Sequence, residues 1–150
     1  MAPAPNMSNS PGINGLKIRG EHLYYTNAAR LAFCRVKLNS DGTAAGPYEV
    51  LHVDSGPAYD DFAMSRRGIA YIAHTRGCGL TRSTPVGNAS SILEGVNTTV
   101  GSTAAAFSRD WKETLYVVTS GGLAAGLFEP ARVLAIAGLQ WKLTNDVRAA

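Results

Sequence analysis

The sequence predicts an all-β protein built from consecutive four-stranded antiparallel sheets. The first observation is a unit that occurs three times: a strand of small and apolar residues, a charged turn, and a second strand ending in aromatic and aliphatic residues. The second observation is its spacing, because the equivalent positions Leu23, Ala70 and Leu115 lie 47 and 45 residues apart. Strand-containing repeats of this length are typical of β-propeller blades. The chain is therefore expected to form a partial β-propeller of about three blades.

The first blade is predicted over residues 12–56 from the alternation of apolar and polar side chains. Leu16 and Ile18 alternate with polar neighbours, and Leu23 and Tyr25 do so after a short turn. A period of two is the pattern of a half-buried strand. A hairpin turn is expected where Gly42 supplies a positive φ. The predicted strands cover residues 16–19, 23–26, 33–38 and 48–53.

The second and third blades are predicted over residues 57–100 and 101–137, so that the three blades together span 12–137. Residues 1–11 are predicted to be a disordered arm, and residues 138–150 a tail or an extra strand. The predicted strands of the second blade cover residues 62–64, 69–73, 80–84 and 91–93. Those of the third blade cover residues 104–107, 114–119 and 132–136.

Composition excludes several classes of function. The chain has 150 residues, of which 45% are hydrophobic and 17% charged, which is the profile of one globular domain. The net charge of +3 is scattered and no basic run exceeds Arg66-Arg67, so nucleic acid is not an expected partner. No apolar run is long enough to cross a membrane, and residues 1–11 do not form a secretory signal. Cys34 and Cys78 fit no metal-binding spacing and are predicted to be free, buried thiols.

Three segments carry a resemblance to a known family. They are PGINGL with LYYTN (11–16 and 23–27), DDFA with AYIAH (60–63 and 70–74), and TAAAF with LYVVTSGG (103–107 and 115–122). In this order and spacing the chain resembles the senescence-marker-protein/gluconolactonase family of six-bladed β-propellers, and in particular its fungal branch. The resemblance covers about residues 11–137 and is to the C-terminal half of the family, which implies half of a six-bladed ring.

The resemblance implies a metal-dependent lactone hydrolase that is incomplete as a single chain. Members of the family hold one divalent metal on the propeller axis through a glutamate, an asparagine and an aspartate, and the aspartate doubles as a proton acceptor. Asn14 matches the asparagine and Asp60 the aspartate. The glutamate belongs to earlier blades that have no counterpart here. The expected ion is Ca²⁺, with Zn²⁺ or Mg²⁺ as alternatives, and binding is expected to be weak in a single copy.

The architecture gives these residue types a physical reason. The innermost strands of a propeller start around one axis, so Asn14, Asp60 and Thr103 are expected to converge and offer oxygen ligands of the kind that hard cations take. Residues that end the second strand of each unit should reach the same face, and they are predicted to bind substrate with Thr103. These residues are Asn27, His74 and Ser120.

Each candidate also has a structural interpretation. Asn14-Gly15 is foremost a turn dipeptide, and Asp60 with Asp61 could be two solvated carboxylates at a turn. Asp61 is expected to cap a turn or to pair with Arg66. The four tyrosines of the strands are expected to pack between blades rather than to stack on substrate. They are Tyr24, Tyr25, Tyr71 and Tyr116.

Two other functions stay open. The chain could be a metal-free fungal propeller enzyme of secondary metabolism, of the dehydratase/hetero-Diels-Alderase type, or a non-catalytic propeller remnant or binding module. A small-molecule substrate is the expected ligand of either enzyme.

Three blades do not close a ring, so two sheet faces would stay exposed. The chain could therefore be a fragment of a longer protein, or two copies could pair as a homodimer that closes the propeller. Fungal members of the family are often exported, so the resemblance leaves an extracellular location open.

Overall fold

The computed structural model describes residues 12–56, 58–95, 97–123 and 126–139. Within these ranges the chain forms eleven β-strands in three antiparallel sheets and one short 3-10 helix, η1 (Asn97–Thr99). The predicted arm over 1–11 and most of the predicted tail over 138–150 lie outside these ranges. The all-β fold class predicted from the sequence is confirmed.

Each sheet is a meander in which consecutive strands pair with one another, as expected for propeller blades. We call the sheets blade 1, blade 2 and blade 3. Blade 1 contains β1 (Ile13–Arg19), β2 (His22–Asn27), β3 (Ala32–Lys37) and β4 (Glu49–Val53). Blade 2 contains β5 (Tyr59–Met64), β6 (Ala70–His74), β7 (Leu80–Ser83) and β8 (Ala89–Ile92). Blade 3 contains β9 (Ser102–Phe107), β10 (Leu115–Thr119) and β11 (Val133–Ile136).

The structure corrects the bounds of several predicted strands. All three innermost strands begin earlier than predicted, β1 at Ile13 rather than residue 16 and β9 at Ser102 rather than residue 104. The innermost strand of blade 2 begins at Tyr59, not at residue 62, because the two acidic residues that follow Tyr59 lie within the strand rather than in a turn before it. The outermost strand of blade 2 covers Ala89–Ile92, somewhat earlier than the predicted 91–93. Blade 3 has three strands among the described residues.

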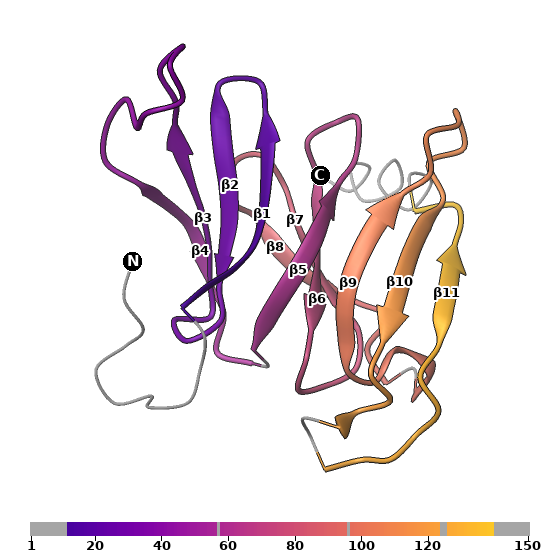
Figure 1. The fold of residues 1–150 in the computed structure, drawn as a ribbon. Coiled ribbons are helices and arrows are strands. Elements are labelled where there is room, and N and C mark those ends of the chain that lie inside the picture. Colours follow the sequence, from indigo (N-terminus) through magenta and orange to yellow (C-terminus); the bar gives the residue numbers. More distant parts are fainter. Residues whose placement is uncertain (1–11, 57, 96, 124–125, 140–150) are drawn as a thin grey trace, which may run out of the picture.

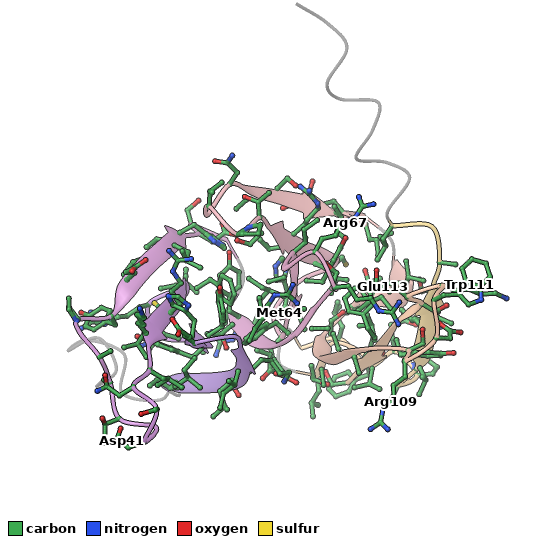
Figure 2. The ribbon with its side chains drawn as sticks, turned by 90° about the horizontal axis from the view of Figure 1, so that it is seen from above. Asp41, Met64, Arg67, Arg109, Trp111 and Glu113 are labelled. Atoms are coloured by element: carbon green, nitrogen blue, oxygen red, sulfur yellow. The ribbon has the colours of Figure 1, made fainter. Side chains whose placement is uncertain are left out.

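The three blades stand side by side in chain order, with blade 2 in the middle (Figure 1). The innermost strand of blade 2, β5, contacts both β1 and β9, so the first strand of each blade lies beside that of the next. Seen from above, Asp41 in a turn of blade 1 and Trp111 in a turn of blade 3 lie at opposite ends of the molecule (Figure 2). Trp111 is 79% exposed.

The core between the blades consists of two apolar layers, one between each pair of neighbours. Fully burying one large apolar side chain contributes about 1.5–3 kcal/mol, so these layers hold the blades together. The layer between blades 1 and 2 contains Tyr24, Phe33, Tyr59, Phe62, Ala70 and Ile72. The layer between blades 2 and 3 contains Ala63, Ile69, Tyr71, Ala73, Leu80, Ala105, Leu115 and Val117. A third and smaller buried cluster, Tyr25, Ala32 and Cys34, lies on the side of blade 1 that faces away from blade 2.

The two cysteines are free, as predicted, but only Cys34 is buried. Cys34 lies in the middle of β3, where Tyr25 pairs with it across the sheet. Cys78 is half-exposed in the loop between β6 and β7, so the prediction that it is buried is wrong.

Candidate functional site

The innermost strand of every blade begins with a β-bulge. The strand register shifts between Ile13 and Leu16 in β1, between Tyr59 and Phe62 in β5, and opposite Val118 and Thr119 in β9. A bulge leaves residues without a cross-strand partner and redirects their side chains, which is why bulges occur beside functional sites. The residues within the three bulges are Asn14 and Gly15, Asp60 and Asp61, and Thr103.

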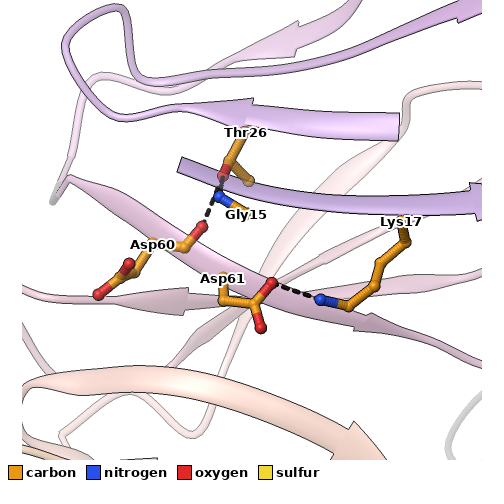
Figure 3. A network of polar contacts seen from close by, with 5 residues as sticks. All are labelled: Gly15, Lys17, Thr26, Asp60 and Asp61. Carbon is orange, nitrogen blue, oxygen red and sulfur yellow. Dashed lines mark hydrogen bonds and ion pairs between the residues drawn. The ribbon is translucent and has the colours of Figure 1, made fainter. Parts of the chain in front are cut away.

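The bulges of blades 1 and 2 are in direct contact (Figure 3). The Gly15 amide donates a hydrogen bond to Thr26 Oγ1 (2.9 Å), and this hydroxyl in turn donates to the carbonyl oxygen of Asp60 (2.6 Å). A Cβ atom on Gly15 would lie 2.5 Å from Asp61 Oδ1 and 2.7 Å from Asp61 Cα, so only glycine fits. The Asn14-Gly15 step is therefore not a turn, because its glycine is required by the close approach of β5.

This approach brings the first two predicted ligands together. The Asn14 side chain lies close enough to the carboxyl group of the half-buried Asp60 to influence its pKa through hydrogen bonding. Burial raises the pKa of Asp60, the bond from Asn14 lowers it and the neighbouring charge of Asp61 raises it, with a net pKa above the usual aspartate value. A carboxylate with a raised pKa is better matched to accepting a proton near neutral pH.

Asp61 points in a different direction from Asp60 (Figure 3). Its Oδ1 atom lies 2.6 Å from Lys17 Nζ, in an ion pair between blades 2 and 1. The predicted pairing with Arg66 is therefore wrong. The Arg66 guanidinium instead donates to the backbone carbonyls of Arg109 and Asp110 in blade 3.

The other predicted substrate-binding residues make local contacts. Thr103 Oγ1 lies 3.5 Å from the Val118 carbonyl, a long and weak hydrogen bond that leaves its hydroxyl available. Ser120 Oγ donates to the Gly101 carbonyl (3.1 Å). Asn27 is fully buried, and its Oδ1 atom accepts a hydrogen bond from the backbone amide of Arg30 (3.1 Å).

His74 lies inside the molecule rather than on an open surface. It is 3% exposed, its Nε2 atom lies 2.8 Å from Thr81 Oγ1, and its ring stacks on Tyr59 with centroids 5.7 Å apart. Its Nδ1 atom has no hydrogen-bond partner among the described residues. Burial lowers the pKa of His74, which opposes protonation, and Asp54 partly counteracts this. Contact with a substrate would require this part of blade 2 to move.

A polar network between blades 1 and 2 was not predicted from the sequence. Tyr59 Oη lies 2.7 Å from His52 Nε2 and donates to Asp54 Oδ2 (3.0 Å). Ser83 Oγ lies 3.3 Å from the other nitrogen of His52. These contacts connect serine, histidine and aspartate, but Ser83 is fully buried, so the network serves to join the blades and offers no accessible nucleophile. No sequence spacing marks this network, because its members lie on three strands, β4, β5 and β7, and on the loop after β4.

The bulges of blades 1 and 2 bring the two predicted oxygen ligands, Asn14 and Asp60, close together. Among the described residues no group of three or more His, Cys, Asp or Glu side chains is arranged to hold a metal ion. Asn14 and Asp60 are hard oxygen donors that suit Ca²⁺ or Mg²⁺, but such ions take six or more oxygens and usually several carboxylates. The oxygen donors of one chain are of the type that such an ion binds, but they are fewer than its coordination requires.

The fold is half of a β-propeller, and comparison with solved structures supports this. A luciferin-regenerating enzyme matches with a TM-score of 0.69 and 15% identity, over 88% of this chain and 47% of that chain. Regucalcin from Agrobacterium tumefaciens, a calcium-binding protein, matches with a TM-score of 0.64 and 18% identity, over 84% and 46%. A structural-genomics target assigned to the gluconolactonases matches with a TM-score of 0.59 and 19% identity, over 83% and 40%.

The propellers with which the chain shares its fold are of the gluconolactonase-like kind, so the predicted resemblance is confirmed at the level of the fold. The chain spans less than half the length of each of these proteins. A scan against known protein families found no match, and a search of curated proteins found none either. In the described part of the chain, no helix is long and apolar enough to cross a membrane.

Proposed function

We propose that this chain supplies half of the axial site of a gluconolactonase-like propeller and takes part in the metal-dependent hydrolysis of lactones. The observation that carries the proposal is the contact between the bulges that hold Asn14 and Asp60, where the Gly15 amide, the Thr26 hydroxyl and the Asp60 carbonyl are joined by hydrogen bonds. Asn14 would provide an amide oxygen and Asp60 a carboxylate to a divalent cation, with Ca²⁺ as the first candidate. Both roles match the expectation from sequence.

A cation held there would polarise a carbonyl group and lower the pKa of water. The chain's own chemistry is then proton transfer by Asp60. Water attacks the lactone carbonyl carbon while the Asp60 carboxylate takes its proton, and the ring C–O bond breaks. The proton passes to the leaving oxygen, so the product is an open-chain hydroxy acid. The raised pKa of Asp60 supports this role because it strengthens the carboxylate as a base.

The remaining predicted residues have positioning roles in this proposal. The weakly bonded hydroxyl of Thr103 is the best placed to orient a substrate, because it belongs to the equivalent bulge of blade 3. Ser120 directly follows β10 and would border the same site, whereas the fully buried Asn27 at the end of β2 would support it from inside through its bond to the Arg30 amide. His74 is buried beneath it and would act through Tyr59 and Thr81 unless blade 2 rearranges.

The first test is a thermal unfolding titration with Ca²⁺, Mg²⁺ and Zn²⁺. A cation that binds only the folded chain at ten times its Kd stabilises it by about 1.4 kcal/mol, which raises the Tm. We expect Asp60→Asn to abolish this rise. Asp61→Asn is the matched control, because it removes the neighbouring carboxylate, which faces Lys17, and should keep the response. A response that survives Asp60→Asn, or that is lost equally in both variants, would contradict the assignment.

The second test is hydrolysis of five- and six-membered sugar lactones in the presence of the stabilising cation. We expect turnover that needs Asp60 and persists in Asp61→Asn. One observation favours a second candidate, a binding module without catalysis: the described residues bring a single carboxylate to the Asn14 side chain. Cation-dependent lactone binding without turnover would support that candidate.

A further inference from the structure

The structure places three tyrosines at equivalent positions in the three blades. In the second strand of each blade, Tyr24 pairs with Lys17, Tyr71 with Ala63 and Tyr116 with Ala106 of the innermost strand. The first two tyrosines are 7% and 2% exposed, whereas Tyr116 is 44% exposed. The position is the same in each case, so the difference reports whether a described blade packs against the tyrosine.

The buried tyrosines are covered by the innermost strand of the next blade. Tyr24 packs in one cluster with Phe62 of β5, and Tyr71 meets the edge of Phe107 of β9 with ring centroids 5.5 Å apart. Phe62 directly precedes, and Phe107 directly follows, the residue that pairs with the tyrosine of its own blade. The corresponding residues of β1 are Leu16 and Ile18.

Among the described residues, no blade precedes blade 1, so Leu16 and Ile18 have no tyrosine of another blade to pack against. They are 54% and 66% exposed, and they lie on the side of blade 1 that faces away from blade 2. We call this side the open face of blade 1. In the cross-strand row that starts at Leu16, Val50 is 50% exposed, whereas Tyr25 and Cys34 between them are buried. The open face of blade 3 is the side away from blade 2 and carries Tyr116, Val118 and Val133, all of them exposed.

We propose that each open face is covered by a second copy of this chain. The open face of blade 3 in one copy packs on the open face of blade 1 in the other, and two-fold symmetry repeats the contact to close a six-bladed ring. A second copy fits because this chain already contains both surfaces of the contact between blades. The same contact occurs between blades 1 and 2 and between blades 2 and 3. Three propellers of the same fold have chains about twice as long, as two copies of three blades would be.

Closure has a consequence for the axial site, and this step rests on the proposed function. The ring would place a second Asn14–Asp60 pair around the same axis. The Asp60 carboxylate of the second copy would then supply part of the charge and coordination that one chain lacks. The interface itself needs no cation, so the two proposals are tested separately.

The test measures molar mass in solution, by light scattering or sedimentation, with a chelator present so that no cation contributes. We expect twice the mass of one chain. Leu16→Glu and Tyr116→Lys should each halve the mass and leave the far-ultraviolet circular dichroism unchanged, since both side chains are exposed. Trp111→Glu is the matched control in an exposed turn outside both faces and should keep the double mass.

The arrangement is tested by mixing Leu16→Glu with Tyr116→Lys. One interface of the mixed pair brings the introduced carboxylate against the introduced ammonium group, and the other interface is unaltered, so the double mass should return. A one-chain mass for the folded, unaltered protein would overturn the proposal. A double mass that Tyr116→Lys abolishes and Leu16→Glu does not would also overturn it, because blade 3 would then pair with itself.

Discussion

The Asp60 carboxylate is held where its charge opposes folding. Burial raises its pKa, so the folded chain binds the Asp60 proton more tightly than the unfolded chain does. Stability is therefore lost as the pH rises through the usual aspartate value of about 3.9, and the loss is complete above the raised pKa. A bound cation would remove this penalty, which is the pattern expected of a functional rather than a structural carboxylate.

We expect Asp60→Asn to raise the free energy of unfolding at neutral pH in the presence of a chelator. The amide keeps a hydrogen-bond acceptor for Asn14 and removes the buried charge. The gain should disappear below about pH 3, where the unaltered carboxyl is protonated in both states. Urea unfolding of both proteins at pH 7 and pH 3 measures the difference. A variant that is less stable at neutral pH would contradict this account.

The histidines His52 and His74 make stability depend on pH in the opposite direction to Asp60. Burial lowers the pKa of both His52 and His74, and Asp54 only partly opposes this, with a further contribution from Glu94 at His74. The fold therefore favours neutral imidazoles. The stability that they contribute is present above the unfolded pKa of about 6.5 and is lost as the pH falls below it towards their lowered pKa values.

We expect the free energy of unfolding to decrease between pH 7 and pH 5. The direct measurement is a titration of the imidazole resonances by nuclear magnetic resonance, in which His52 and His74 should protonate below pH 6.5. Protonation of either ring above that value would show that Asp54 outweighs burial and would reverse the expected slope. The measurement requires no substitution and therefore leaves the packing of Tyr59 intact.

At the scale of the elements, the bulge of β1 depends on the absence of a side chain at Gly15. Gly15→Ala should destabilise the chain by about 1–3 kcal/mol, because a methyl group there would overlap backbone and side-chain atoms of Asp61. Gly46→Ala is the matched control. Gly46 has open space around its Cβ position, so the change should stay within about 0.5 kcal/mol. Equal losses at the two positions, measured by chemical denaturation, would refute the argument.

The strands were predictable because their signal is local. Alternation around Leu23 and Tyr25 marks β2, and the same pattern at Tyr71 and Tyr116 marks the equivalent strands, so the order of the sheets follows from the sequence. The proximity of Asn14 and Asp60 was predictable from the starts of the innermost strands. These features need only a period of two and a repeat length.

The bulges and their consequences were not predictable in this way. A bulge depends on the register of two strands, and Asn14-Gly15 reads as a turn when only one strand is considered. The partner of Asp61 is Lys17, 44 residues away, rather than the nearer Arg66. His74 ends β6 as predicted, but its burial depends on Tyr59 and Thr81 of the strands on either side of β6. The bulges, the partner of Asp61 and the burial of His74 all depend on contacts between residues far apart in the sequence, and a local sequence pattern carries no information about such contacts.

At the scale of the whole molecule, the proposed ring makes stability depend on concentration. A folded pair in equilibrium with unfolded single chains becomes more stable as protein concentration rises. We therefore expect the Tm to increase across a hundredfold range of concentration for the unaltered chain and for Trp111→Glu. It should be constant for Tyr116→Lys, which remains a single chain. A Tm independent of concentration in all three proteins would argue against association.

In the proposed pairing, the open face of blade 3, with Tyr116, is complementary to the open face of blade 1, with Leu16. A gene that encodes such a unit would need one in-frame duplication to specify six blades in a single polypeptide. The duplicated protein would start with two identical halves, and each half could then diverge, one keeping the acidic ligand and the other acquiring residues for substrate selection. Complementary end surfaces are what such a duplication would require.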